Sequence, residues 1–425
     1  MPQVTGETLA AIQERREKLL QMMMADPANL DAAFEYATLS SRAGDLEAAI
    51  STFQRMLILV PGVPRLQLEL GVLYFRLGSY EMAKEYLDRA LAAPNIPQAV
   101  QANVAPYLKA IEERTAVNQF HGGIMIGARY QTNANGGPQD EIINLNGLDF
   151  ILNDTALADS DANAFISGNF RYSRKLSSLG DRFDVDLRTY GALFAEHDEI
   201  DTALGELTFG PVVDLERFGI EDSSIGIYGI LGGIALHGDT YRTSVGAGLE
   251  FDKALSQRTI ASIGAEYRYE DYHNTDLRPT SSYKTGDVYR LSGTVRHRFT
   301  RNLTGFVTAE AQRHDARKDF KSNEEFGLSF GGNYRFASPL DKQERPWVAG
   351  LAAGFLEREY GAADPNILAS TAQRDSEIFV RGMLTVPFKE SWAVQTVVSY
   401  RDVDSNYDIN SHDNATISIG LMRTF

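Results

Sequence analysis

The sequence contains no cysteine and no apolar run long enough to cross a membrane as a helix. The lack of thiols fits an oxidising compartment, in which a stray thiol is a liability. The most apolar stretch, residues 225–236, reads IGIYGILGGIAL. It is short and rich in glycine, whereas a membrane-spanning helix needs about 20 consecutive apolar residues. The composition therefore excludes a helical membrane protein.

Acidic residues outnumber basic residues, and the common catalytic motifs are missing. The net charge of −16 argues against a nucleic-acid partner, because binding to phosphates needs a basic surface. The sequence has no G-x-S-x-G, no H-E-x-x-H and no P-loop. We therefore predict no enzyme activity, no catalytic residues and no cofactor. No two of the seven histidines have the spacing of a metal-ligand pair, so we predict no metal site.

Carboxylates gather in two segments that are predicted to be loops. Residues 402–413 place Asp402, Asp404, Asn406 and Asp408 at alternate positions, which faintly resembles a calcium loop, but Tyr407 stands where the sharp-turn glycine belongs. A solvated loop is the simpler interpretation. Segment 134–161 has six carboxylates and no Lys or Arg. It could serve solubility, a basic client, or lipopolysaccharide bridged by divalent ions.

The first part of the chain has helical periodicity and an internal repeat of 34 residues. The repeat aligns Ala37, Gly44, Ala49, Phe53 and Met56 with Gly71, Gly78, Ala83, Leu87 and Ala90. This period, with glycine in the turn and alanine at the helix crossing, is similar to the tetratricopeptide repeat over about residues 30–97. Because two repeats bury little core, we expect helices near 7–25 and 98–117 to cap them. We predict a helical domain over residues 1–118.

A tetratricopeptide stack presents a concave groove, lined by the first helix of each repeat, that binds extended protein segments. By motif position, the client-binding groove comprises Asp31, Phe34, Thr38, Arg65, Leu68, Val72 and Phe75. The alternative is that some of these side chains only pack against the capping helices.

From residue 119 onward, segments of alternating polarity replace the helical period. In 285–299, Tyr289, Leu291 and Val295 share one face, and arginines such as Arg290 share the other. The length of these segments suits strands that cross a membrane at a tilt. Fourteen segments are predicted: 119–133, 162–175, 183–195, 201–212, 224–236, 239–251, 258–270, 285–299, 303–313, 324–336, 346–358, 376–388, 392–402 and 413–425.

Alternation alone does not distinguish a membrane barrel from a soluble sandwich, but the connections do. The longest ones (134–161, 271–284, 359–375 and 403–412) would all lie on one side, and short ones such as 300–302 and 389–391 on the other. This asymmetry is typical of outer-membrane barrels. The predicted fold is α + β with two domains, in which tetratricopeptide-like repeats precede a 14-stranded antiparallel transmembrane β-barrel over residues 119–425.

Aromatic residues are predicted to form girdles at the two membrane interfaces. Trp347, Trp392 and Phe425 fall beside the short connections on the lipid-facing parity, and Tyr130 and Tyr400 fall near the other rim. The last strand, with Ile417, Ile419, Leu421 and terminal Phe425, is similar to the signal that barrel-insertion machinery recognises.

Charged residues on the opposite parity are predicted to face the barrel lumen, where water or partner side chains lower the free-energy cost of placing a charge. They could tune passage, or they could pair across strands and stiffen the wall. The predicted lumen residues are Asp184, Asp186, Arg188, Arg290, Arg296, Arg298, Arg335 and Arg401.

The junction between the two halves carries a family resemblance. A last helix, VQANVAPYLKAIEERTAV, leads into GGIMIGARYQTNANGGP, with Gly127, Tyr130, Asn133 and Asn135 in a first-strand pattern. Helical repeats feeding such a strand and a fourteen-strand barrel resemble the surface lipoprotein assembly modulators, the translocators of type XI secretion.

The resemblance implies a non-enzymatic translocator in the outer membrane of a Gram-negative bacterium, with the helical domain in the periplasm. Its expected partners are outer-membrane lipid, barrel-insertion machinery and a protein client, either a surface lipoprotein or a small secreted protein, and the translocator is expected to be a monomer. The alternatives are an exopolysaccharide export porin and a structural outer-membrane protein that tethers periplasmic partners. The start of the sequence does not read as a secretory signal, so we expect an exported chain whose leader lies outside this numbering.

Overall fold

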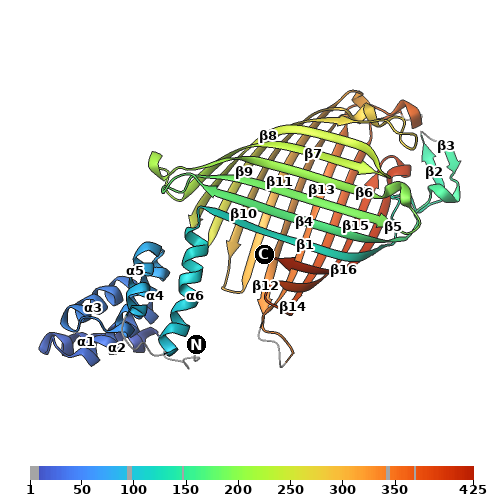
Figure 1. Ribbon diagram of the computed structural model, residues 1–425. Helices are drawn as coiled ribbons and strands as arrows, with labels where there is room; N and C mark the ends of the chain where they lie inside the picture. The colour runs from blue at the N-terminus through green and yellow to red at the C-terminus, as the bar shows by residue number, and fades with distance from the viewer. Residues whose placement is uncertain (1–8, 93–97, 146–147, 341–344, 368–369) are drawn as a thin grey trace. The chain divides into compact units, whose positions relative to one another are not determined.

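The computed structural model describes residues 9–92, 98–145, 148–340, 345–367 and 370–425 (Figure 1). The chain divides into two compact units, Met1–Val117 and Asn118–Phe425. The boundary predicted from the sequence, between residues 118 and 119, differs from this division by one residue. The first unit is helical and the second is a β-barrel.

The described part of the first unit forms six α-helices that pack in sequence order. Repeated turn chemistry sets their ends: Asn29 and Asp45 cap α2 and α3 with side-chain oxygens that accept from the backbone N–H three residues on. Gly44 and Gly78, at φ 88° and 84°, end α2 and α4 in the left-handed conformation that glycine tolerates. The helices are α1 (Leu9–Ala25), α2 (Leu30–Ala43), α3 (Leu46–Leu59), α4 (Pro64–Leu77), α5 (Tyr80–Leu91) and α6 (Gln98–Thr115).

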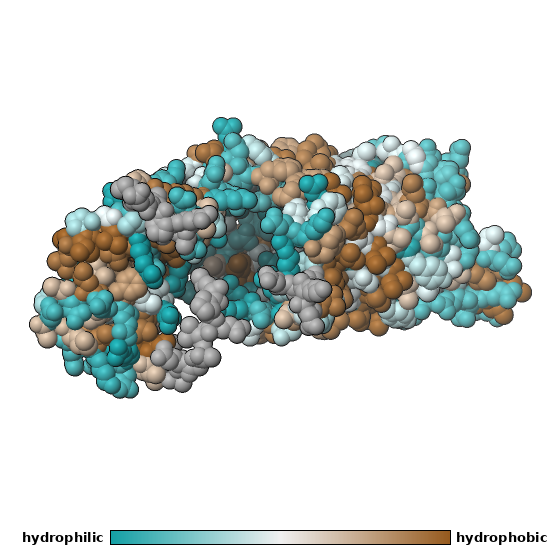
Figure 2. Space-filling model, turned by 60° about the horizontal axis from the view of Figure 1, so that its bottom comes forward, coloured by the Kyte–Doolittle hydropathy of each residue, from teal (hydrophilic) through white to brown (hydrophobic). Residues whose placement is uncertain are grey.

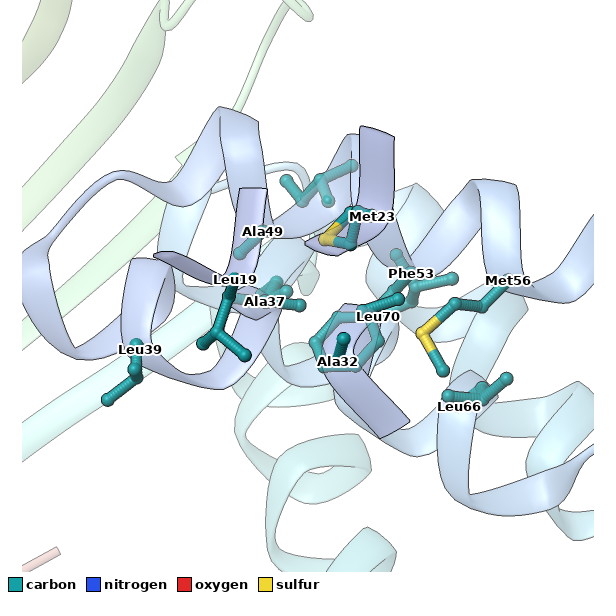
Figure 3. Close-up of a cluster of buried hydrophobic side chains, with 13 residues drawn as sticks. Leu19, Met23, Ala32, Ala37, Leu39, Ala49, Phe53, Met56, Leu66 and Leu70 are labelled. Atoms are coloured by element: carbon teal, nitrogen blue, oxygen red, sulfur yellow. The ribbon is translucent and has the colours of Figure 1, made fainter. Parts of the chain in front are cut away.

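The residues of the 34-residue period form the core of this unit. Ala37 and Ala49 are fully buried at the crossing of α2 and α3, and Phe53 fills the space beside them (Figure 3). The equivalent crossing of α4 and α5 joins Gly71 to Leu87 so closely that a Cβ on Gly71 would lie 2.6 Å from the leucine side chain. The predicted caps are present as α1 and α6, which pack on the two ends of this core.

The second unit is a closed barrel of fourteen antiparallel strands in which each strand pairs with its neighbour in sequence, and β1 closes on β16 (Figure 1). The predicted fold class is confirmed. The barrel strands are β1 (Asn118–Gln131), β4 (Asp161–Lys175), β5 (Arg182–Phe194), β6 (Thr202–Asp214), β7 (Ser223–Leu236), β8 (Asp239–Ser256), β9 (Thr259–Tyr272), β10 (Gly286–Arg298), β11 (Leu303–Ala316), β12 (Asn323–Phe336), β13 (Trp347–Tyr360), β14 (Arg374–Pro387), β15 (Trp392–Ser405) and β16 (His412–Thr424).

The two ends of the barrel differ in their connections. At the end where β1 begins and β16 ends, here called the terminal end, connections such as 257–258 and 388–391 are short. At the opposite, long-loop end lie 132–160, 273–285 and 361–373. The first of these contains a small hairpin of β2 (Ile142–Leu145) and β3 (Leu148–Ile151), which the sequence-based strand prediction did not include.

The apolar side chains at alternate positions of the strands face the exterior of the barrel. Leu351 and Ile126, for example, are 64% and 60% exposed. Figure 2 shows brown, hydrophobic surface over the barrel wall. Such an exterior on a barrel with no free strand edge is the architecture of outer-membrane proteins, because every backbone group is paired within the wall. None of the described helices is both long and apolar enough to traverse a bilayer.

Aromatic side chains mark the terminal end of the outer wall. The Trp347 ring lies 6.2 Å from that of Phe336, and the Arg423 guanidinium lies 5.4 Å from the centre of the Trp392 ring. Phe425 stacks on Phe120, with ring centres 5.6 Å apart. The three predicted girdle positions thus all lie at this end.

Candidate functional site: the barrel lumen and the helical groove

The lumen is lined by the polar parity of the strands. Asp184, Asp186, Arg188 and Arg290 line a cavity of about 590 Å³ on the wall formed by β4 to β11. Asp186 pairs with Arg171 of β4 at 2.6 Å. Asp184 pairs with Arg182 at 2.9 Å on its own strand. The acidic pair of β5 is therefore neutralised locally.

A separate chain of ion pairs crosses the wall from β6 to β11. Arg268 on β9 pairs with Glu206 at 2.5 Å and with Glu266 at 2.9 Å. Arg290 continues the chain, with its Nε 2.9 Å from a carboxylate oxygen of Glu310. The Arg268 side chain is only 11% exposed, so removal of its partners would leave a poorly solvated charge. This part of the lumen wall is therefore stiffened by paired charges.

The remaining predicted lumen residues have fewer partners. Arg401 pairs with Glu377 of β14 at 2.5 Å. Arg298 donates to the Gln257 carbonyl at 2.8 Å. Arg188, Arg296 and Arg335 make no side-chain ion pair within the described ranges. Of these, Arg296 and Arg335 lie towards the terminal ends of β10 and β12, and both residues are exposed.

A second lumenal surface has a different chemistry. A cavity of about 730 Å³ is lined by β1, β4 and β14 to β16. Its lining combines Met125, Phe165, Phe379 and Met383 with arginines, including Arg129. Arg129 lies over the Phe165 ring at 5.2 Å and donates to the Tyr190 hydroxyl at 3.1 Å, and it pairs with no carboxylate among the described residues. Because methionine adapts to irregular partners, this side of the lumen offers a more apolar and more adaptable surface than the ion-paired side.

The carboxylates of the ion-pair chain, Glu206, Glu266 and Glu310, were missed as lumen residues by the sequence analysis. They share the inward parity of Thr208, Arg268 and Gln312 on their own strands. In every strand of the barrel alternate residues face the lumen, and this alternation is the signal in the sequence that identifies the three carboxylates.

The helical unit places the predicted groove residues in two different environments. Asp31 and Arg65 are exposed, and the Arg65 guanidinium lies 5.2 Å from the centre of the half-buried Phe34 ring. Thr38 donates to the Phe34 carbonyl within α2. These four residues of the predicted groove are here called the α2 groove.

The other predicted groove residues lie on α4, where α6 packs. Leu68 and Phe75 contact the cluster that includes Val104 and Ile111 of α6. Phe75 also lies edge-on to Tyr107, with ring centres 5.3 Å apart. Val72 is half-buried on the same helix. Packing by the last helix therefore occupies part of the predicted surface.

The acidic loops contain one histidine held between two carboxylates. The His197 ring contacts Glu199 at 2.9 Å and Asp159 at 3.2 Å, and so joins the β5–β6 connection to the β1–β4 connection. Burial lowers its pKa, but the hydrogen bonds and charges of Glu199 and Asp159 outweigh burial, so the net shift of the pKa is upward. For the part of the chain that the structure describes, no carboxylate or histidine cluster could hold a metal ion, the segment 402–413 included.

We expect this loop contact to weaken as the pH rises. A raised folded-state pKa means that the stabilisation is complete below the unfolded value of about 6.5 and is lost as the pH passes the folded value. As the pH rises from about 6.5 through the folded-state pKa of His197, hydrogen exchange of residues 148–160 should accelerate by more than its intrinsic increase with pH. In His197→Gln the extra acceleration should disappear. A wild-type profile that coincides with that of His197→Gln would contradict the assignment.

Comparison with known proteins supports the repeat. Residues 41–102 match the family model of the tetratricopeptide repeat. This match confirms the repeat that the 34-residue period predicted. No curated protein sequence matches the chain significantly.

Solved structures match parts of the chain at low sequence identity. A bacterial polysaccharide outer membrane secretin is 9% identical, with a TM-score of 0.37 over 72% of this chain and 98% of its own. The outer membrane channel DcaP of Acinetobacter baumannii is 10% identical, with a TM-score of 0.37 over 72% and 97%. The MamA structure is 15% identical, with a TM-score of 0.23 over 26% and 68%.

Proposed function

We propose that this chain is an outer-membrane translocator that delivers a protein client, a surface lipoprotein or a small secreted protein, to the cell surface. The helical unit faces the periplasm and receives the client, and the barrel lumen takes part in its delivery. The observation that carries the proposal is the direct connection of a tetratricopeptide unit to a barrel: α6 ends at Thr115 and β1 begins at Asn118.

The short junction connects the helical unit covalently to the first strand of the barrel. A client held by the helical unit is tethered at the terminal end of the barrel, which raises its effective concentration there without any further contact. The α2 groove offers Arg65, Asp31 and the Phe34 ring, which suit an extended segment with charged and apolar side chains. The mixed surface around Met125 and Phe379 offers such a segment a matching wall in the lumen.

The test compares surface proteins of cells with and without the full chain by protease accessibility and mass spectrometry. We expect specific proteins to be lost from the cell surface when the chain is deleted. Arg65→Glu, which reverses an exposed charge of the α2 groove, should lower their surface signal about tenfold, as expected for the loss of one well-placed charge contact. Lys84→Glu reverses an exposed charge on α5 and should leave the signal unchanged.

Other outcomes would favour the alternatives. Loss of exported polysaccharide with an unchanged set of surface proteins would assign the chain to polysaccharide export. If neither changes on deletion, the helical unit only tethers partners. Equal effects of Arg65→Glu and Lys84→Glu would remove the α2 groove from the proposal.

A further inference from the structure

The long-loop end of the lumen contains a cavity that the translocator role does not use. It has a volume of about 480 Å³, within the range of about 300–1,000 Å³ for small-molecule sites. Here called the long-loop cavity, it lies among the ends of β8 to β13 and is also lined by connections at that end. The residues that carry the argument are Arg242, Tyr272, Lys284, His314, Asn323 and Tyr360.

Two cationic groups in this cavity keep donors without partners. Arg242 pairs with Glu270 at 2.8 Å through Nη1, but its buried Nε has no hydrogen-bond partner. Lys284 Nζ donates to the Tyr241 hydroxyl at 3.2 Å. Within the described residues, no carboxylate lies at ion-pair distance from Lys284. The cavity can therefore accept an anionic group.

Two buried acceptors in the same cavity also have no partner. His314 is 7% exposed, and its Nε2 makes no hydrogen bond to any residue that the structure describes. The backbone of Lys284 hydrogen-bonds to the His314 ring, and a carbonyl accepting from the other nitrogen leaves Nε2 of the neutral ring with a lone pair. The Asn323 Oδ1 is likewise unpartnered, whereas its Nδ2 donates to the Lys321 carbonyl. Buried polar atoms are normally hydrogen-bonded, so these two acceptors suit a ligand that carries hydroxyl groups.

We infer that the long-loop cavity binds a small hydroxylated carboxylate of the acidic-sugar class. The carboxylate would lie by Lys284 and Arg242, and ligand hydroxyls would donate to His314 Nε2 and Asn323 Oδ1. Tyr272, whose ring centre lies 6.4 Å from that of His314, and Tyr360 provide flat apolar surfaces for a sugar ring. The site needs no protein client, so its test is independent of the proposed function.

The test is calorimetric titration of the full-length chain in detergent micelles with D-glucuronate, D-glucose and acetate. Glucuronate should bind at least about tenfold more tightly than glucose, which lacks the charge, and than acetate, which lacks the hydroxyls. Absence of glucuronate binding up to about 10 mM, or equal affinity for glucuronate and glucose, would overturn the inference.

Variants distinguish the two halves of the site. Lys284→Met should weaken glucuronate binding about tenfold and leave glucose binding unchanged, because it removes only the anion contact. His314→Phe keeps a ring beside Tyr272 and should weaken both sugars. Lys318→Met removes a cation from the same end outside the cavity and should change neither affinity. Lys284→Gln replaces Lys284→Met if thermal melting shows the latter unfolded. Equal effects of Lys284→Met and Lys318→Met would contradict the site.

Discussion

Gly127→Ala is expected to lower the yield of closed barrel severalfold. Gly127 lies on β1 opposite Gly420 of β16, the strand pair that closes the cylinder and that Figure 1 draws in teal and dark red. A Cβ at this position would lie 2.3 Å from the Ile419 carbonyl oxygen, 2.7 Å from the Phe165 ring and 2.8 Å from the Gly420 Cα. Two of these atoms belong to the backbone of the partner strand, which cannot move without breaking the hydrogen bonds of the seam.

The expected cost of this crowding is about 3 kcal/mol, the upper part of the range for overpacking, because a backbone atom must shift. The yield of closed barrel should fall severalfold. The measurement is the fraction of the unheated protein that migrates as a compact band on electrophoresis after refolding into detergent.

The matched control is Gly293→Ala. Gly293 lies within β10, and a Cβ there would meet no atom within 4 Å. The same glycine-to-alanine change should therefore leave the compact fraction unchanged. If Gly127→Ala closes as well as Gly293→Ala, the register of β1 on β16 is wrong.

Much of the helical unit could be predicted because its signal is local. A period of 34 residues placed Ala37, Ala49 and Phe53 together, and the structure buries all three. The packing of α6 over Leu68 and Phe75 depends on where the chain turns after α5, which the repeat does not encode. The sequence therefore does not determine how many of the predicted groove residues remain accessible.

The barrel was predictable for a similar reason, and its lumen only in part. A period of two residues and the asymmetry of the connections define the strands and the outward face. Ion pairing in the lumen depends on register and on reach across several strands. Arg268 on β9 pairs with Glu206 on β6, 62 residues away. Parity shows that both side chains face inward, but only the closed structure shows that they meet.

The long-loop cavity could not be found from the sequence either. Lys284, His314 and Arg242 lie in connections and strands up to 72 residues apart in numbering, from 242 to 314. No short spacing joins them, so none of them belongs to a recognisable metal-binding or catalytic motif. That Arg242 Nε and His314 Nε2 have no hydrogen-bond partner among the described residues becomes visible only when the surrounding strands are in place.

Phe53→Ala is expected to destabilise the helical unit strongly and leave the barrel intact. The Phe53 ring is 1% exposed and lies edge-on to Phe34, with ring centres 5.4 Å apart. Removing a buried phenylalanine ring costs about 3–5 kcal/mol, and a domain of this size is stable by only about 5–15 kcal/mol. With only two recognisable repeats, the rest of the core cannot compensate for much of that loss.

Hydrogen exchange of the full chain separates this effect from general destabilisation. In Phe53→Ala, amides of α2 to α4 should lose protection, while those of β1 and β4 to β16 should keep it. Ile58→Ala truncates a side chain of the same helix that is 78% exposed, and it should change stability by less than about 0.5 kcal/mol. Since the two units have separate cores, loss of protection in the strands of Phe53→Ala would show that they fold as one, contrary to the division after Val117.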